Sequence, residues 1–215
     1  MVWEHGRLHA DGAPGLIPEA TIEVVSDLAD TLRAALDPAH PDPSLPEGTP
    51  AAVVVPVVEA GEPTLLFTRR TQDVRTHKGE ISFPGGARHP DDESLLRTAL
   101  RETEEEVGIP RDRLDVLGRL RYMRAAVSGF VVVPFVARLA ERPPIRPNPA
   151  EVDEVLELEL GRLAEAERLE QRTWGRGSYH TYTYRLDGQV VWGLTGRILH
   201  HLLETLRREG WTWQT

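Results

Sequence analysis

The stretch FPGGARHPDDESLLRTALRETEEEVGIP, residues 83–110, decides the fold of this chain. It opens with two adjacent glycines, continues with apolar residues at helical spacing, and ends with four glutamates within five residues. The pattern predicts a glycine turn and then a helix over residues 92–107, because Gly108 is a favourable C-terminal cap and Pro110 prevents continuation. The expected buried stripe of this helix is Leu96, Leu100, Thr103 and Val107.

The glutamates of the predicted helix gather on one face. At roughly 100° per residue, Glu102, Glu105 and Glu106 lie within roughly 100° of one another, whereas Glu104 points elsewhere. Arg101 can brace Glu105 four residues later, but one guanidinium cannot neutralise three carboxylates. A run of glutamates by itself is typical of a solvated helix face. The alternative is a metal site, since Mg²⁺ or Mn²⁺ takes oxygen ligands and would relieve the repulsion.

The wider spacing around these glutamates resembles the Nudix box, the signature of hydrolases that cleave a nucleoside diphosphate linked to another moiety. The matching positions are Gly86, Glu93, Arg101, Glu102, Glu105, Glu106, Gly108 and Ile109. The interval between Gly86 and Glu93 is one residue longer than in the box. Asp92 therefore competes with Glu93 for the same place in the pattern.

The resemblance implies a divalent cation, Mg²⁺ or Mn²⁺, as the cofactor. It implies Glu102 and Glu106 as the main metal ligands, with Glu105 as a further ligand or a catalytic base. It also implies a small-molecule nucleotide as the substrate.

Other catalytic and binding roles follow from the same resemblance. Arg101 would orient the glutamates, and the backbone around Gly85 and Gly86 would contact the substrate. A general base from a distant loop is common in this family, and Glu151 is the candidate in this chain; its alternative is an ordinary surface glutamate.

The segment upstream of the box points to a particular substrate. Its sequence LLFTRRTQDVRTHKGEISFPGG, residues 65–86, resembles the segment that precedes the box in coenzyme A pyrophosphatases. That resemblance implies hydrolysis of coenzyme A or a derivative to 4′-phosphopantetheine and adenosine 3′,5′-bisphosphate. Arg69, Arg75 and Lys78 are the candidate substrate-binding residues. With Arg70 and His77 they form a basic island, and guanidinium groups suit phosphate oxygens.

Three alternatives remain open at this point. The first is that the residues of the basic island are ordinary solvated loop charges. The substrate of a Nudix hydrolase could instead be ADP-ribose, an NDP-sugar or a dinucleoside polyphosphate. The chain could also be a nucleotide-sensing module without catalysis, although such a module has no need for an unneutralised acidic face.

Patterning elsewhere predicts an α+β fold, an α/β/α sandwich. Expected strands cover residues 51–58, 64–70, 114–123 and 129–139, with another ending near residue 160 and a hairpin around Asp187-Gly188. Helices are expected over residues 18–36 and 194–209, and Pro56 suggests an edge strand or a bulge. The Nudix resemblance implies a mixed sheet between helices. Residues 1–49, a helix with a proline-rich connector, would pack on a Nudix domain of residues 50–215.

Composition limits the other possibilities. The net charge of −9 argues against general binding to nucleic acid or anionic membranes. No apolar run is long enough to span a bilayer and no export signal is evident, so a cytoplasmic location is expected. The absence of cysteine excludes thiolate chemistry and disulfides. The adjacent His200 and His201 point about 100° apart on a helix, and are interpreted as structural. Oligomeric state is not specified.

Overall fold

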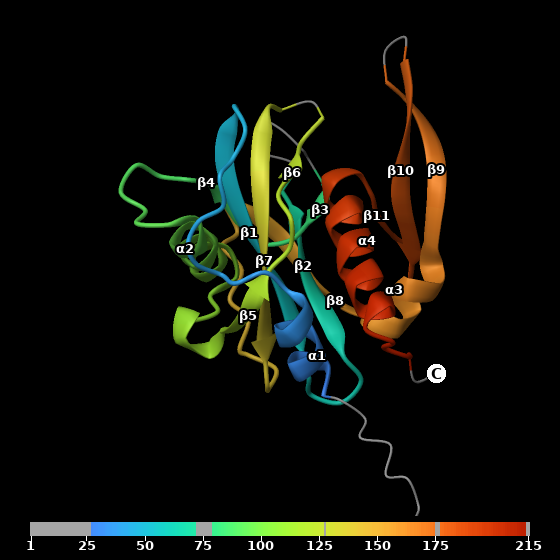
Figure 1. Cartoon of the computed structure of the whole chain (residues 1–215), viewed down its shortest axis with the longest axis horizontal. Coiled ribbons are helices and arrows are strands. Elements are labelled where there is room, and N and C mark those ends of the chain that lie inside the picture. Colours follow the sequence, from blue (N-terminus) through green and yellow to red (C-terminus); the bar gives the residue numbers. More distant parts are fainter. Residues whose placement is uncertain (1–26, 72–78, 127, 175–176, 214–215) are drawn as a thin grey trace, which may run out of the picture.

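A mixed β-sheet forms the centre of the computed structural model, which describes residues 27–71, 79–126, 128–174 and 177–213. Its strand order is β3-β2-β1-β7-β5, with β4 on β1, β6 on β7 and β8 on β2 (Figure 1). Only β1 and β7 are described as parallel neighbours, and the other pairs are antiparallel. The strands are β1 Thr49–Val58, β2 Thr64–Arg70, β3 Ile81–Ser82, β4 Gly85–Ala87, β5 Asp115–Arg119, β6 Met123–Arg124, β7 Phe130–Leu139 and β8 Val152–Glu159.

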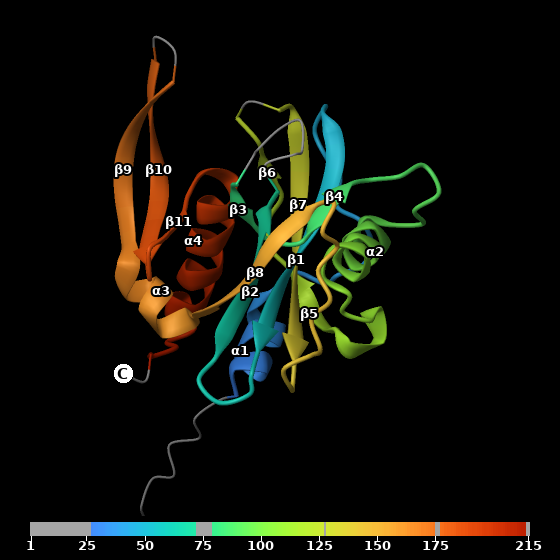
Figure 2. The ribbon, with the colours of Figure 1, turned by 180° about the vertical axis from the view of Figure 1, so that it is seen from behind.

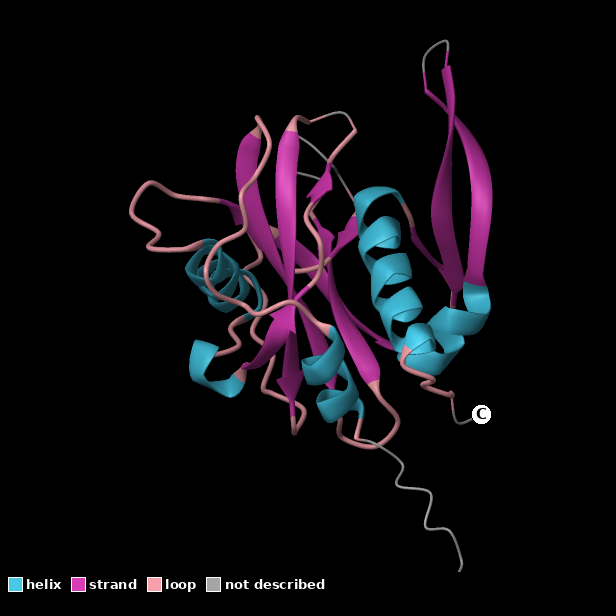
Figure 3. Ribbon diagram, viewed as in Figure 1, coloured by secondary structure: helices cyan, strands magenta, loops and turns pink. Residues whose placement is uncertain are grey.

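Helices cover both faces of this sheet, and a second sheet lies on the outer side of helix α4 (Figures 2 and 3). Helix α2 packs on one face, while α1 and α4 pack on the other. The three-stranded sheet β11-β10-β9 contacts α4 and α3. The remaining elements are α1 Leu28–Ala35, α2 Leu95–Val107, the 3₁₀ turn Arg111–Arg113, α3 Leu160–Ala166, β9 Glu167–Trp174, β10 Gly177–Leu186, β11 Gln189–Val191 and α4 Gly193–Arg208. The expected α/β/α arrangement with a mixed sheet is confirmed.

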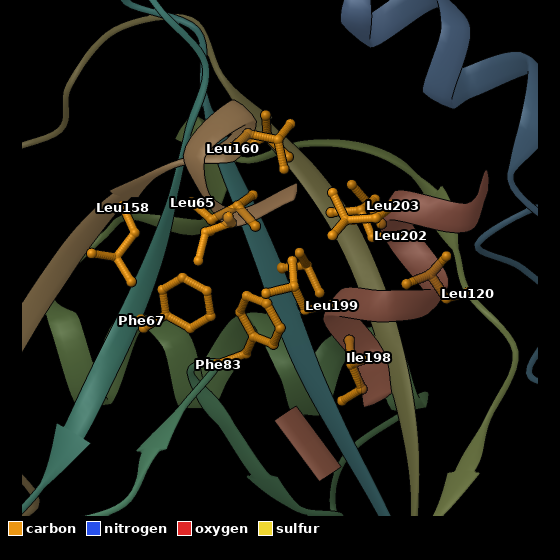
Figure 4. Close-up of a cluster of buried hydrophobic side chains, with 14 of the residues drawn as sticks. Leu65, Phe67, Phe83, Leu120, Leu158, Leu160, Ile198, Leu199, Leu202 and Leu203 are labelled. Carbon is orange, nitrogen blue, oxygen red and sulfur yellow. The ribbon is translucent and has the colours of Figure 1, made fainter. Parts of the chain in front are cut away.

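Strand alternation divides the core into two halves. Val55 and Val57 of β1 face α4, whereas Ala52 and Val54 face α2, because successive strand residues point to opposite sides. On the α4 side, Leu199 packs among residues that include Phe67 and Phe83, whose rings stack 4.6 Å apart (Figure 4). The buried apolar side chains of α4 are Ile198, Leu199, Leu202, Leu203 and Leu206, which recur at helical spacing.

Helix α2 starts later than expected. It begins at Leu95 rather than at residue 92, because the Ser94 side chain accepts a 3.2 Å hydrogen bond from the Arg97 amide as the N-cap. The carboxylate of Asp42, from the proline-rich connector, accepts the Leu95 amide at 3.1 Å. Gly108 caps the other end with φ of 71°. The predicted stripe of Leu96, Leu100, Thr103 and Val107 is buried throughout.

The expectation for Pro56 was wrong, because β1 is a central strand with β7 on one side. On its other side, β4 pairs with residues 51–53 and β2 pairs with residues 57–58. The Val54 amide, two residues before Pro56, points to that side and donates to the Pro84 carbonyl at 2.9 Å. Pro56 therefore falls in the gap between two ladders, where a missing N–H removes no ladder bond.

Several other expectations need adjustment. The N-terminal helix is described only from Leu28, and residues 18–26 lie outside the described ranges. The single strand expected over residues 114–123 is two strands, β5 and β6, and both pair with β7. The hairpin turn at Asp187 and Gly188 is confirmed, with φ of 51° and 77°. Strand β9 and helix α3 were not predicted. None of the helices in the described ranges combines the length and apolarity needed to cross a bilayer.

Candidate active site

The carboxylates of α2 differ sharply in exposure. The side chain of Glu106 is 4% exposed, that of Glu102 is 18% exposed and that of Glu105 is 56% exposed. Glu104 points away from them and pairs with Arg111 at 2.5 Å. The predicted acidic face thus runs from solvent at Glu105 to the protein interior at Glu106.

Glu106 is a buried acid with incomplete compensation. Its carboxylate accepts a 3.1 Å hydrogen bond from the Gly85 amide and lies 3.8 Å from the guanidinium of Arg70. Burial raises the pKa of Glu106 to about 7, despite these two contacts, and the charges of Glu102 and Glu151 act in the same direction. An additional positive charge at this point would stabilise the ionised form.

The two glycines of β4 make room for the carboxylates. A Cβ on Gly86 would lie 2.6 Å from the carboxyl carbon of Glu102, so a side chain there would displace that group. Gly85 has φ of 149°, and a Cβ on it would lie 2.3 Å from the carbonyl oxygen of Ala52. Its amide is directed at Glu106 rather than left open to a substrate. The packing itself therefore requires glycine at position 85, whereas a side chain at position 86 would push the Glu102 carboxylate aside.

Arg101 connects the acidic residues on both sides of the helix start. Its guanidinium donates two hydrogen bonds of 3.0 Å to Asp92, one of 2.8 Å to Glu102 and one of 3.0 Å to Glu105. These contacts hold the pKa of Asp92 well below its usual range and raise that of Arg101. Asp92 and Glu93 compete for one position of the Nudix-box pattern. The side chain of Asp92 contacts Arg101 and is 8% exposed, whereas the side chain of Glu93 is 84% exposed.

We expect Asp92→Asn to lower the free energy of unfolding by about 2 kcal/mol, because it removes the charged partner of Arg101. Turnover should fall by roughly 10–100-fold, since Arg101 would no longer be held against Glu102. Chemical denaturation and steady-state rates measure the two effects. Glu93→Gln is the matched control and should stay within about 0.5 kcal/mol of the parent protein.

The stability difference should also depend on pH. The pKa of Asp92 is lowered in the folded protein, so its contribution is fully present above the ordinary carboxyl range and is lost as the pH falls below about 4. Equal stability of Asp92→Asn and Glu93→Gln at neutral pH would contradict the assigned role of Asp92.

The loop before β8 brings Glu151 toward α2. The Asn148 amide donates to the Glu106 carbonyl at 2.9 Å, which docks this loop on the last turn of the helix. The negative charge of Glu151 contributes to raising the pKa of both Glu102 and Glu106, so its carboxylate lies within electrostatic range of both. A residue more than forty positions away along the chain thereby joins the acidic face.

The basic island is divided by strand alternation. Arg69 follows Leu65 and Phe67 on the α4 side, where it donates to Glu154 at 3.1 Å and contacts Gln189. Arg70 points to the α2 side and lies beside Glu106. The pairing of β2 with β8 shifts its register between these two residues, so that Arg69 lies opposite Glu154 and Arg70 lies opposite Val152. Leu66 and Arg70 are four residues apart on β2, so alternation places them on the same side of the sheet. This sequence signal could have identified Arg70 as the arginine nearer to α2.

Arg75, His77 and Lys78 lie outside the described residues. The expected grouping of Arg69 with Arg75 and Lys78 at a substrate site therefore stays a prediction.

The donor set fits a divalent metal ion by its chemistry. No group of three acidic or histidine side chains in the described ranges is already arranged to hold one. Arg101 engages Glu102, and Arg70 lies beside Glu106. The oxygens of Glu102, Glu105 and Glu106 are nevertheless hard ligands of the kind that Mg²⁺ and Mn²⁺ prefer. Buried Glu106 also lacks full charge compensation, which a cation would provide.

Comparison with known proteins identifies the class to which this fold and acidic face belong. The NUDIX domain family model matches residues 48–182, so the chain belongs to the Nudix family. It is a Nudix hydrolase, an enzyme of the class that cleaves substituted nucleoside diphosphates with divalent metal ions.

Two curated relatives carry the same family description. The protein named "Uncharacterized Nudix hydrolase NudL" in Photorhabdus laumondii subsp. laumondii is 39% identical over 162 residues, covering 73% of this chain and 84% of the relative. Its namesake in Pectobacterium atrosepticum is 41% identical over 160 residues, covering 71% and 80%. A solved MutT protein from Methanosarcina mazei Go1 has a TM-score of 0.48 and 21% identity, and the match covers 79% of this chain and 100% of that one.

Proposed function

We propose that this Nudix hydrolase cleaves the diphosphate of coenzyme A or a close derivative, with Mg²⁺ or Mn²⁺, to give 4′-phosphopantetheine and adenosine 3′,5′-bisphosphate. The observation that carries the hydrolytic part is the convergence of Glu102, Glu106 and the loop residue Glu151 beside the two glycines of β4. The coenzyme A part rests on the segment of residues 65–86 and its resemblance to coenzyme A pyrophosphatases.

Different residues would bind the metal, position its ligands and accept the proton. Glu102 and Glu106 would hold the metal, with Glu105 as a more exposed further ligand or base. When bound, the metal supplies positive charge for the diphosphate and activates water. Arg101 holds Glu102 in place and is itself held by Asp92. Glu151 would accept a proton from the attacking water, and its electrostatic effect on Glu102 and Glu106 supports this role.

Arginine chemistry supports a phosphate-rich substrate. Arg70 lies 3.8 Å from Glu106, at the edge of the acidic face. Once a metal neutralised Glu106, this guanidinium would become available to a phosphate oxygen, which it can bind through two hydrogen bonds. Arg70 is therefore the described residue best placed to contact the diphosphate next to the metal.

A substrate panel with and without divalent metal tests the proposal. We expect turnover of coenzyme A with Mg²⁺ or Mn²⁺, none with EDTA, and the two expected products by chromatography. ADP-ribose, an NDP-sugar and a dinucleoside tetraphosphate are the comparison substrates, and kcat/KM should be at least about tenfold higher for coenzyme A. Faster turnover of any comparison substrate would refute the coenzyme A assignment while preserving the Nudix chemistry. Loss of activity on every compound would refute both.

A further inference from the structure

A hollow lies along α4, on the face of the central sheet opposite α2. Its volume is about 270 Å³, just below the usual range for ligand pockets. Its walls come from three places in the chain: the segment before β6, strand β10 and helix α4. The lining residues that bear on its chemistry are Arg121, Tyr182, Arg197, His200, His201 and Arg208.

The hollow carries positive charge without matching carboxylates. Within the described ranges, none of Arg121, Arg197 and Arg208 forms an ion pair, whereas most arginines elsewhere in those ranges pair with an acid. Glu204 is the single acidic residue that lines the hollow, and it is exposed to solvent. All three arginines are exposed to solvent, so an anion from solution can reach them, and their combined field attracts it.

The hydrogen bonds of these arginines leave most of their donors free for a ligand. Arg197 donates to the Arg124 carbonyl at 3.1 Å, and Arg208 donates to the Glu204 carbonyl and to Thr205 at 3.3 Å each. A guanidinium has five N–H donors, so these contacts position the side chains without saturating them.

His201 lines the same hollow beside Arg121. Its Nε2 accepts a 3.3 Å hydrogen bond from Arg121, so the neutral ring carries its proton on Nδ1. That Nδ1 is shielded from solvent and has no partner among the described residues. Burial lowers the pKa of His201, and the charges of Arg121 and Arg208 lower it further. The ring therefore stays neutral in a strongly positive surrounding and lacks an acceptor.

The neighbouring side chains make a fixed wall for a ligand. The ring of Tyr182 stacks on His200 with centroids 3.5 Å apart, and His200 Nδ1 is hydrogen-bonded to Glu167 at 2.5 Å. Arg207 also pairs with Glu167 at 2.6 Å, which ties α4 to the start of β9. These contacts hold α4 against β10 and β9 on one side of the hollow.

We propose that the hollow formed by Arg121, Arg197, Arg208 and His201 is a phosphate-binding site that takes a phosphate monoester or diphosphate group of a small molecule. Phosphate oxygens supply the negative charge and accept hydrogen bonds from the free guanidinium donors of the three arginines. The group belongs either to a separate phosphorylated ligand or to the far end of the substrate, and the chemistry of recognition is the same in both cases.

Inorganic phosphate and pyrophosphate, titrated into the metal-free full-length chain in EDTA, are the probes. We expect saturable shifts of the His201 ring resonances in NMR spectra, assigned with a His201→Gln variant, while the exposed His89 stays unchanged. Arg121→Ala and Arg197→Ala should each weaken binding by about tenfold, the loss expected for a charge-assisted hydrogen bond. Arg185→Ala is the matched control, because Arg185 is an exposed arginine paired with Glu170 outside the hollow.

The absence of a saturable His201 shift, or equal weakening by Arg185→Ala and Arg197→Ala, would overturn the proposal. This result does not depend on the substrate, so it stands even if coenzyme A is not hydrolysed. Hydrolysis assays then identify the source of the phosphate. A higher KM of Arg197→Ala for coenzyme A but not for dephospho-coenzyme A would place the 3′-phosphate of the substrate in the hollow. Unchanged KM values together with retained phosphate binding in the parent would indicate a separate ligand.

Discussion

Replacing Glu106 by Gln should reduce hydrolysis by about a thousandfold or more, because the variant loses the buried carboxylate proposed to bind the metal. The change preserves shape and leaves an oxygen that can still accept the Gly85 amide. Folding should therefore be retained. Steady-state rates and Mn²⁺ binding by calorimetry measure the effect, and both should be lost together.

Glu104→Gln provides the matched control for this experiment. It makes the same chemical change on the same helix, two residues away, but Glu104 pairs with Arg111 on another face. We expect full activity and unchanged Mn²⁺ affinity. Comparable losses in the two variants, or full activity of Glu106→Gln, would refute the assignment of the buried carboxylate as a metal ligand.

Glu106→Gln should also alter how the free energy of unfolding depends on pH. In metal-free protein the pKa of Glu106 rises from 4.5 to about 7. The folded state then holds a proton that the unfolded chain has released, so the free energy of unfolding falls as the pH rises through this interval. Glu106→Gln removes this term. Its metal-free stability above pH 7 should equal or exceed that of the parent protein, as measured by urea denaturation in EDTA.

Replacing Gly85 by Ala should have the largest effect on stability. The new Cβ would lie 2.3 Å from the Ala52 carbonyl oxygen and 2.5 Å from the Val53 Cα, both backbone atoms of the central strand β1. The backbone would also have to keep φ of 149°, which residues with a side chain rarely adopt. Strain and overpacking together should cost about 2–5 kcal/mol, and the displaced Gly85 amide would no longer support Glu106.

Gly61→Ala separates the two causes of the stability loss in Gly85→Ala, which are backbone strain and steric overlap. Gly61 also has a positive φ, of 108°, but a Cβ there would meet nothing within 4 Å. It should therefore show only the conformational part, about 1–2 kcal/mol, and keep its activity. Urea denaturation of both variants, with activity assays, measures the difference. If Gly85→Ala proved no less stable than Gly61→Ala, the tight contact between β4 and β1 would be refuted.

Local periodicity was sufficient to predict the features that depend on neighbours along the chain. The buried stripe of α2, the apolar face of α4 and the hairpin turn at Asp187-Gly188 all follow from spacing over a few residues. The relation of Arg101 to Glu105 follows from it as well, since residues four apart meet on a helix. The first residue of α2 did not follow from periodicity, because Asp92, Glu93 and Ser94 can all serve at a helix start.

Contacts between distant segments could not be predicted in this way. The approach of Glu151 to Glu106 requires the loop before β8 to dock on the end of α2, through main-chain hydrogen bonds that any sequence could make. The division of Arg69 from Arg70 depends on which face of the sheet each helix covers. The hollow along α4 joins Arg121 to Arg197 across more than seventy residues.

The order of residues alone therefore specifies the acidic helix, its glycine entry and the family to which they belong, because these are short-range patterns with fixed spacing. Tertiary packing decides which of those acids is buried, which arginine faces them and where unpaired arginines collect. The physical reason is that burial and charge compensation are set by surroundings drawn from the whole chain, and no local repeat records them.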